Sequence, residues 1–427
     1  MRYLVAWFLA VSVPALAAPA TPTPNLTGAR VAQKLQMIEG LPVELRPPEK
    51  SDDKPAFPQQ TRAPYHHAAD WDVVQLTDQL HGAWAIAPLP SGNFLLTERL
   101  KGVMRLMTAD GTLSDPLTGM DMLAPPGKLG LLDVVTAPDF GRSNRIYFSF
   151  FEAMADRNSN TFLASGILDE TNKAVRDLKV VFRAQPYEAV KNFGLKQGGR
   201  IAFGRDGSIF LSVGDRDMNT VPEYELALAQ NLGNHIGKIV RIMPDGRVPR
   251  DNPFVNKPGA MPEIWAYGIR SPEGMAVDPR TGKLWESEHG PRGGDELNLI
   301  KRGGNYGWPT ISRGLDYPGT PLLKGEVARP GMEQPVYYWD PVIGPSGLAI
   351  YDGKAFPAWK GDLLVGGLRG AGVYRLTLKN GRVVSEEPIL ADLRYRVRDV
   401  RVGPEGAVYV VTDGDRVFKI TPRIKAD

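Results

Sequence analysis

The chain has 427 residues, in which 51 lysines and arginines face 48 aspartates and glutamates, giving a formal net charge of +3. A charge this close to balance gives no indication of nucleic-acid binding or of attachment to a membrane surface. Cysteine is absent, which excludes disulfides, thiolate metal sites and a cysteine nucleophile. The 46 glycines and 37 prolines indicate many tight turns, as in folds built from repeated short strands.

Residues 1–20 have the organisation of a secretory signal peptide. Arg2 precedes an apolar run over residues 4–13, and the small-residue pattern Ala15-Leu16-Ala17 follows it. The apolar run is too short to span a bilayer. We therefore expect export to the periplasm, removal of this segment and no stable membrane insertion.

Residues 21–70 are rich in Pro, Thr, Lys and Asp, as in the run LPVELRPPEKSDDKPAFPQQ. This composition is typical of a tether or of an irregular arm laid on the following domain. The sequence assigns it no function.

From residue 71 to residue 427 the chain repeats one pattern. An apolar strand is followed by a turn with Pro, Asp, Gly or Asn, and then by a strand rich in β-branched and aromatic residues. The six units begin at Ala85, Leu131, Gly199, Gly274, Ser346 and Arg398. Repeats this regular favour a propeller over a sandwich, because sheets arranged radially keep only short edges and meet at an axial ligand site. We predict an all-β, six-bladed β-propeller.

The run EHGPRGGDELNLIKRGGNYGWP, residues 288–309, combines acids with glycine turns. Asp295 and Glu296 offer hard oxygen ligands, and the turn that includes Gly290 and Pro291 can direct carbonyl oxygens inward, as a calcium site requires. The same spacing fits a glycine-rich turn whose acids cap neighbouring amides. Spacing alone leaves both interpretations open.

This run, together with WAYGIRSPEGMAVDP before it and GLLDVVTAPDFGRSNRIYFSF earlier, resembles the soluble quinoprotein sugar dehydrogenases, the glucose/sorbosone and aldose sugar dehydrogenase group. The resemblance extends from about residue 71 to the C-terminus. It implies a six-bladed propeller that carries pyrroloquinoline quinone (PQQ) and Ca²⁺. It also implies oxidation of a sugar at its anomeric carbon to the lactone, with transfer of electrons to an acceptor, by a monomer or homodimer.

The resemblance implies a set of cofactor-binding arginines. PQQ is a planar tricarboxylate, and guanidinium groups pair with two carboxylate oxygens at once. The matching positions are Arg270 in GIRSPEG, Arg369 in GGLRGAGVYRL, and Arg396 and Arg398 in RVRDVRVGPEG. A single arginine is more often a solvated or blade-bridging residue, but four at motif positions favour cofactor binding.

The resemblance also implies two calcium sites. Backbone carbonyls of Gly290 and Pro291 match those that hold the ion beneath the quinone, whereas Glu296 and a carbonyl near Tyr306 match a structural ion. His289, beside Gly290, is expected to be a hydrogen-bonded loop residue and not a ligand.

Two positions depart from the family's catalytic centre. The histidine that acts as general base is replaced by Lys196 in LKQGGRIAFG, and an active-site glutamine is replaced by Lys128. The family's Asn and Gln that follow Arg270 become Ser271 and Glu273. Positive charges around Lys196 favour its neutral form, which is the form a base needs. We therefore expect Lys196 and Lys128 to be catalytic.

Three interpretations remain open from the sequence. Lys196 substitutes for the base of a dehydrogenase, or a propeller without redox chemistry uses its basic funnel on an acidic sugar, for example as a lyase in which a lysine removes the proton next to a neutralised carboxylate. In the third, the propeller only binds carbohydrate. Quinone binding separates the first interpretation from the other two.

Overall fold

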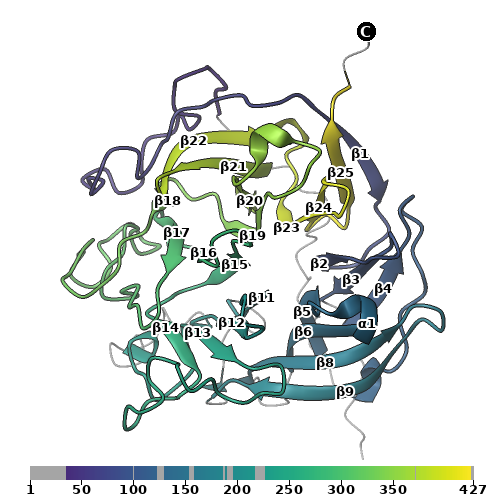
Figure 1. The fold of residues 1–427 in the computed structure, drawn as a ribbon. Helices are drawn as coiled ribbons and strands as arrows, with labels where there is room; N and C mark the ends of the chain where they lie inside the picture. Colours follow the sequence, from purple (N-terminus) through teal and green to yellow (C-terminus); the bar gives the residue numbers. More distant parts are fainter. Residues whose placement is uncertain are drawn as a thin grey trace, which may run out of the picture.

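The computed structural model describes residues 35–99, 101–122, 129–152, 158–185, 188–189, 196–216, 227–370 and 372–424. Within these ranges, five four-stranded sheets and one three-stranded sheet are arranged radially around a common axis (Figure 1). The predicted six-bladed β-propeller is confirmed. Each of the six sequence repeats supplies the innermost strand of one blade.

The blades are numbered in chain order. Blade 1 contains β2 (Ala83–Pro88), β3 (Phe94–Glu98) and β4 (Val103–Met107), and blade 2 contains β5 (Leu129–Thr136), β6 (Arg145–Glu152), β8 (Thr161–Asp169) and β9 (Ala174–Arg183). Blade 3 contains β11 (Gly198–Phe203), β12 (Ile209–Val213), β13 (Lys238–Ile242) and β14 (Ile264–Tyr267), and blade 4 contains β15 (Pro272–Val277), β16 (Leu284–Glu288), β17 (Asp295–Ile300) and β18 (Tyr337–Trp339). Blade 5 contains β19 (Pro345–Ile350), β20 (Leu363–Gly367), β21 (Gly372–Lys379) and β22 (Arg382–Ile389), and blade 6 contains β23 (Val397–Val402), β24 (Val408–Thr412), β25 (Val417–Pro422) and β1 (Trp71–Thr77).

The remaining elements are short. They are the two-stranded pair β7 (Asn158–Ser159) and β10 (Glu188–Ala189), the helix α1 (Phe140–Ser143), and the 3₁₀ turns η1 (Met120–Met122), η3 (Ala227–Ala229), η4 (Pro357–Trp359) and η5 (Ala391–Leu393). In the part of the chain that the structure describes, no helix is long and apolar enough to cross a membrane.

The ring is closed by strands from both ends of the domain. β1 pairs antiparallel with β25 as the outermost strand of blade 6, in a register that opposes Trp71 to Pro422. The start of β1 coincides with the predicted start of the propeller at residue 71. Because β23, β24 and β25 come from the C-terminal end of the chain, this pairing joins the two ends of the domain within one blade (Figure 1).

The core is divided among the blade interfaces. Six apolar clusters occur among the described residues, one between each pair of neighbouring blades. The strands next to the innermost ones, such as β3 and β12, are buried along their whole length. Both faces of a blade are covered there by the adjacent blades. The stacked rings of Phe150 and Phe162, 4.9 Å apart, lie in the cluster between blades 1 and 2. Each blade therefore depends on its two neighbours for burial.

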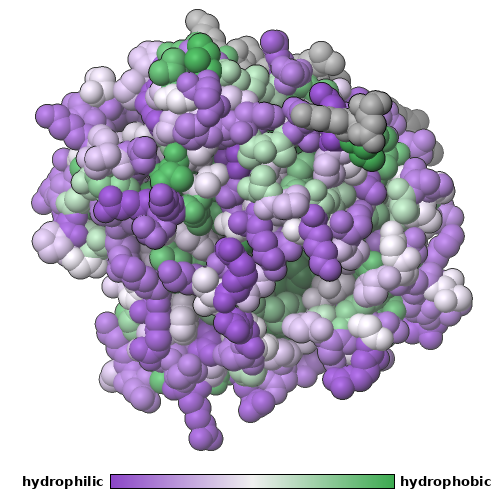
Figure 2. Space-filling model, turned by 45° about the horizontal axis from the view of Figure 1, so that its top comes forward, coloured by the Kyte–Doolittle hydropathy of each residue, from purple (hydrophilic) through white to green (hydrophobic). Residues whose placement is uncertain are grey.

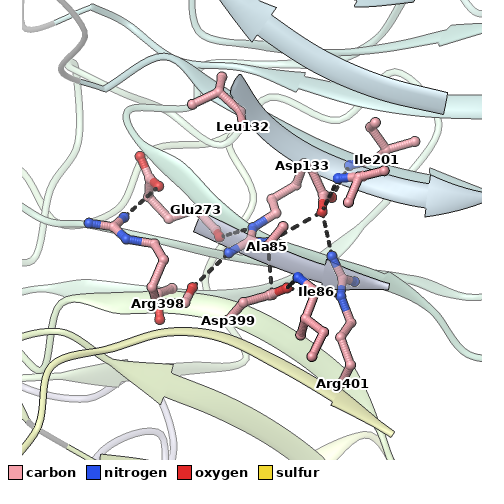
Figure 3. A network of polar contacts seen from close by, with 12 residues as sticks. Ala85, Ile86, Leu132, Asp133, Ile201, Glu273, Arg398, Asp399 and Arg401 are labelled. Atoms are coloured by element: carbon pink, nitrogen blue, oxygen red, sulfur yellow. Dashed lines mark hydrogen bonds and ion pairs between the residues drawn. The ribbon is translucent and has the colours of Figure 1, made fainter. Parts of the chain in front are cut away.

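A buried ion network joins the blades at the axis (Figure 3). Arg200 of β11 donates to the Asp399 carboxylate at 2.8 Å and to the backbone carbonyls of Glu273, at 2.7 Å, and Arg398, at 2.8 Å. Arg401 donates to both Asp399 and Asp133. The two arginines and two aspartates balance in charge, and together they link blades 2, 3, 4 and 6.

Backbone amides of two inner strands, β2 and β11, complete this network. The Ile86 N–H of blade 1 donates to Asp399 at 3.1 Å, and the Ile201 N–H of blade 3 donates to Asp133 at 2.9 Å. Although burial alone would lower it, the pKa of Arg401 is raised by Asp133 and Asp399. Arg401 therefore stays charged at the centre of the ring.

The substitution Asp399→Asn tests the contribution of this network. It removes one of the two buried carboxylates that neutralise Arg200 and Arg401. The free energy of unfolding should therefore fall by about 3–5 kcal/mol in denaturant titrations. The matched control is Asp139→Asn, which removes the exposed ion pair with Arg142 and should change stability by at most about 0.5 kcal/mol. An equally small effect of Asp399→Asn would contradict a central role for the network.

The arm preceding β1 is packed against the outside of the propeller. Residues 35–70 run along blades 4 and 5 in an irregular course, close to β18 and β22 (Figure 1). The buried Gln60 side chain donates to the Pro335 carbonyl at 2.8 Å, and the Ala63 N–H donates to the Tyr337 hydroxyl at 2.9 Å. Of the two possibilities raised by its composition, the described part is an arm laid on the domain. The predicted signal peptide lies outside the described residues.

Candidate active site

A cavity of about 380 Å³ lies on the axis beside the ion network. Its volume falls in the range of small-molecule sites. Its walls come from every blade's inner region and from the loop that follows β17, and its lining residues are Trp84, Arg99, Leu132, Lys196, Gln197, Gly198, Ser271, Glu273, His289, Tyr317, Leu368, Arg396 and Arg398. The face shown in Figure 2 is hollowed near its centre, where hydrophobic residues lie deeper than the hydrophilic residues around them.

Irregular pairing of the inner strands creates this lining. In all six blades, the register between the innermost strand and its neighbour shifts close to the start of the innermost strand. Such bulges redirect side chains relative to a regular ladder. The shifts in β2, β15 and β23 enclose Trp84, Glu273 and Arg398 respectively, which all line the cavity. The neighbouring Asp399 points to the axial network instead.

The described lining contains four cations, Arg99, Lys196, Arg396 and Arg398, and one carboxylate, Glu273. Asp413 lies behind two of the cations: it accepts from Arg398 Nε at 2.8 Å and from Arg396 Nε at 3.1 Å. Burial alone would lower the pKa of Arg398, but Asp413 and Glu273 raise it. The cavity is therefore suited to a ligand with several negative charges.

Glu273 is an acid in a basic cavity. Its side chain is only 10% exposed, and its Oε2 lies 3.6 Å from Arg398 Nη1 (Figure 3). Burial raises the pKa of Glu273, and the opposing pull of Arg398, Arg200 and Arg99 does not cancel that effect. A polyanionic ligand that approaches Arg398 would meet this carboxylate.

Lys196 lies in the wall of the cavity, beside Gln197 and Gly198, where it can contact a bound ligand. Its backbone is left-handed, with φ of 47°, and its carbonyl accepts the Arg216 N–H at 3.2 Å. Such a conformation is uncommon for a residue with a β-carbon and occurs often at functional positions. Lys128 lies outside the described residues, so its catalytic role remains a prediction.

The remaining predicted arginines have different surroundings. Arg270 is buried beside the cavity, where it donates to the carbonyls of His289 and Gly290, each at 2.8 Å, and to the Tyr317 hydroxyl at 3.1 Å. Arg369 follows the lining residue Leu368, but its side chain is exposed. Arg396 and Arg398 are thus the predicted cofactor ligands that line the main cavity, and Arg270 supports its wall.

His289 lines the cavity as a neutral imidazole. Burial, together with the charges of Arg270 and Arg398, lowers its pKa to about 3. Its Nε2 lies 2.7 Å from the Pro345 carbonyl, so a neutral ring donates its proton there and keeps Nδ1 as an acceptor. The expectation of a hydrogen-bonded loop residue fits this contact.

A second, smaller hollow of about 20 Å³ lies beside the first. Gly290, Pro291, Glu296 and Tyr306, the residues predicted to hold calcium, all line it, together with Glu288. Its volume is enough for one water-sized occupant. The structure therefore brings the four predicted calcium residues together.

Three buried carboxyl groups crowd together beside this hollow. The Asn298 amide donates to Glu286, Glu288 and Glu296 at 3.1–3.3 Å, and the Glu286 Oε1 atom is buried with no hydrogen-bond partner. Burial raises the pKa of Glu296 to about 7. The three carboxylates do not converge as a metal cluster of acidic or histidine side chains, and none of that kind occurs in the described ranges. A cation beside Glu296 would favour the ionised form of these carboxyl groups.

Comparison with known proteins decides the family. The sequence model of the Glucose / Sorbosone dehydrogenase family matches residues 80–419. The chain belongs to this family. It is 40% identical over 356 residues to the aldose sugar dehydrogenase YliI of Escherichia coli (strain K12), a match that covers 82% of this chain and 93% of that protein.

Solved structures agree with this assignment. The soluble aldose sugar dehydrogenase from Escherichia coli, in its apo-form, aligns with a TM-score of 0.75 and 39% identity over 83% of this chain and 100% of that one. The PQQ-bound aldose sugar dehydrogenase from Streptomyces coelicolor aligns with a TM-score of 0.66 and 27% identity over 83% and 99%. The resemblance drawn from the motifs, to the PQQ-dependent sugar dehydrogenases, is confirmed.

Sequence reasoning missed some lining residues of this glucose/sorbosone dehydrogenase family member. Arg99 directly follows β3, and Tyr317 comes from the long loop after β17. The position of Arg99 at the end of a second blade strand was a usable signal, because such ends meet near the axis. Tyr317 had no local signal, since only the course of its loop brings it to the cavity.

Glu273→Gln tests how this acid affects anion binding. The carboxylate faces Arg398, Arg200 and Arg99, with Asp413 behind Arg398 and with Lys196 and His289 in the same cavity. A bound tricarboxylate favours protonated Glu273, so the affinity of the wild type for PQQ should fall as pH rises through the raised pKa. The variant should bind about tenfold more tightly at pH 8 and lose this pH dependence.

Equilibrium titration with PQQ between pH 5 and 9 measures both effects. Glu405→Gln, at an acid outside the cavity, is the control for removal of a carboxylate and should keep the wild-type pH profile. Weaker binding by Glu273→Gln would show that Glu273 helps to hold the ligand.

Proposed function

We propose that the protein is an exported, periplasmic PQQ- and Ca²⁺-dependent aldose dehydrogenase that oxidises the anomeric carbon of a sugar to the lactone. The observation that carries this proposal is the axial cavity, in which four cations surround a single carboxylate in a chain of the glucose/sorbosone dehydrogenase family. The name of the PQQ-bound relative from Streptomyces coelicolor supports the choice of cofactor.

The residues present fit this cofactor. Arg396 and Arg398 are fixed by Asp413, so their guanidinium groups are already oriented for carboxylates. Arg99 adds a third cation, and its own pKa is lowered by burial and by Arg398, so a bound anion would relieve the repulsion between them. Arg369, exposed next to Leu368, remains a proposed ligand at the rim.

The residues of the small hollow fit calcium. Oxygen ligands from carboxylates and carbonyls are those that Ca²⁺ prefers. The Gly290 carbonyl accepts from Arg270 but has a second lone pair, and Glu296 and Tyr306 lie in the same hollow. We propose that Gly290 and Pro291 contribute to a site beneath the cofactor, and that Glu296 and Tyr306 hold a structural ion.

The chemistry that PQQ supplies when bound is acceptance of a hydride, with two electrons, from the anomeric carbon of the sugar. The protein's own task is to take the proton of the anomeric hydroxyl. Lys196 lines the cavity at the position of the family's base, and Lys128 remains a second proposed catalytic residue. Trp84, whose ring centre lies 4.0 Å from the Arg200 guanidinium carbon, supplies an aromatic surface in the same cavity as Lys196.

The basic cavity also supports a second candidate, a propeller that binds or cleaves an acidic sugar without redox chemistry. Arg99, Arg396 and Arg398 would neutralise a sugar carboxylate, and Lys196 in its neutral form would remove the adjacent proton. The two candidates differ in their need for a quinone.

Titration of metal-free protein with PQQ and Ca²⁺ separates the candidates. We expect a calcium-dependent change in the quinone absorbance, together with a melting temperature that rises with ligand concentration. Mg²⁺ is the control, because it prefers a smaller octahedral site with several waters. Stabilisation by Ca²⁺ with no effect of PQQ would reject the dehydrogenase and leave acidic oligosaccharides as ligands to test.

Lys196→Ala tests the proposed base. Loss of the proton acceptor should lower kcat by about 10²- to 10⁴-fold with little change in melting temperature, because the side chain lines a cavity and is only half-buried. Lys196→His restores the family's residue and should retain or raise activity. Full activity of Lys196→Ala in steady-state assays would exclude Lys196 as the base.

A further inference from the structure

The N-terminal arm contacts the cavity wall from outside. The family match begins at residue 80, so residues 35–70 lie before it. Two wall segments face this arm: the turn over residues 289–294, which supplies His289, Gly290 and Pro291, and the loop over residues 312–317, which ends in Tyr317. Charged groups of the arm meet both segments.

The strongest of these contacts is a buried ion pair. Arg313 Nη1 lies 3.0 Å from both carboxylate oxygens of Asp53, and the two side chains are 2% and 3% exposed. Arg313 also donates to the Lys54 carbonyl at 3.1 Å and to Gln334 at 2.8 Å. Its guanidinium lies 4.7 Å from the centre of the Tyr338 ring. Removal of Asp53 would leave a buried cation without its counter-charge.

Backbone hydrogen bonds connect the loop that contains Arg313 to the 289–294 turn, which is proposed to hold calcium. The Arg292 N–H donates to the Leu315 carbonyl at 3.0 Å, and the Leu315 N–H donates back at 2.8 Å. This exchange fixes the 312–317 loop against the residue that follows Pro291. Tyr317, two residues beyond Leu315, then accepts from Arg270 at the cavity wall.

The arm holds the same turn at two further points. Glu49 forms an ion pair with Arg292 at 2.7 Å, which is partly exposed and therefore weak on its own. The Asp340 carboxylate accepts the N–H groups of Glu49, at 2.8 Å, and Lys50, at 3.0 Å. That carboxylate lies so close to Gly293 that a β-carbon there would be 2.6 Å from its Oδ1. The 289–294 turn therefore packs against the Asp340 carboxylate, which accepts hydrogen bonds from the arm.

We propose that residues 49–54 of the arm are a positioning element of the active site, which holds the 289–294 turn and the 312–317 loop in the arrangement that binds Ca²⁺ and PQQ. Asp53 is the main positioning residue, acting through Arg313, and Glu49 assists it through Arg292. The inference rests on the proposed function for the identity of the ligands, but the contacts of the arm with the wall are independent of it.

Asp53→Asn tests this inference. Hydrogen–deuterium exchange measured by mass spectrometry should become faster for the amides of residues 290–294 and 313–317, because the loop loses its buried anchor. The affinity for Ca²⁺, measured by titration of the metal-free protein, should weaken by about tenfold, as when an outer partner of a metal ligand is lost. Glu49→Gln should show the same changes at smaller size and serves if Asp53→Asn does not fold.

The matched control is Asp362→Asn. Asp362 forms a buried ion pair with Arg375 in blade 5, which also pairs with Glu387, so its loss removes a buried carboxylate without touching the wall. This variant should keep wild-type Ca²⁺ affinity and wild-type exchange in both segments. Unchanged exchange in Asp53→Asn and Glu49→Gln, or equal loosening in the control, would overturn the inference. If the wild type binds neither Ca²⁺ nor PQQ, the proposed function fails, while the exchange result still decides the role of the arm.

Discussion

The axial ion network is the constraint on which the rest of the structure depends. A propeller has no single core, so its blades must be held at one centre, and here Arg200 and Arg401, with Asp133 and Asp399, link blades 1, 2, 3, 4 and 6. Their charges balance and the strands around them supply amide donors, so the group is satisfied without water. The cavity lies directly beside it, and neighbouring residues divide between the two: Leu132 and Arg398 face the cavity, whereas Asp133 and Asp399 face the network.

Much of the fold could be predicted because each repeat carries the same turn-and-strand signal. The units at Ala85, Leu131, Gly199, Gly274, Ser346 and Arg398 coincide with the inner strands, since burial on both faces demands continuous apolar runs. The course of residues 35–70 could not be read from composition. Pro-rich segments are usually tethers, but here charges such as Asp53 and Glu49, together with scattered buried apolar residues such as Ala63, attach the segment to the domain.

The candidate site was predictable in part. Arg396, Arg398 and Lys196 were found from motif positions and do line the cavity, and the predicted calcium residues share one hollow. Glu273 was identified from the sequence as a departure from the family, but its contact with Arg398 was not predicted. This contact arises from strand bulges, which leave no sequence signal. Arg270 illustrates the same limit: its motif predicts a cofactor ligand, and its side chain donates to carbonyls of the turn beside the cavity. The cavity therefore combines several basic groups with a lysine, Lys196, at the position proposed for the proton acceptor.

The most direct test of the account is the reductive half-reaction under anaerobic conditions. Protein reconstituted with PQQ and Ca²⁺ is mixed with an aldose in the absence of an electron acceptor, and the quinone spectrum and the sugar product are followed together. The account predicts reduction of one quinone per lactone formed, in a single turnover that depends on Lys196. Binding of PQQ without any sugar-dependent change of its spectrum, across a panel of neutral and acidic aldoses, would contradict it.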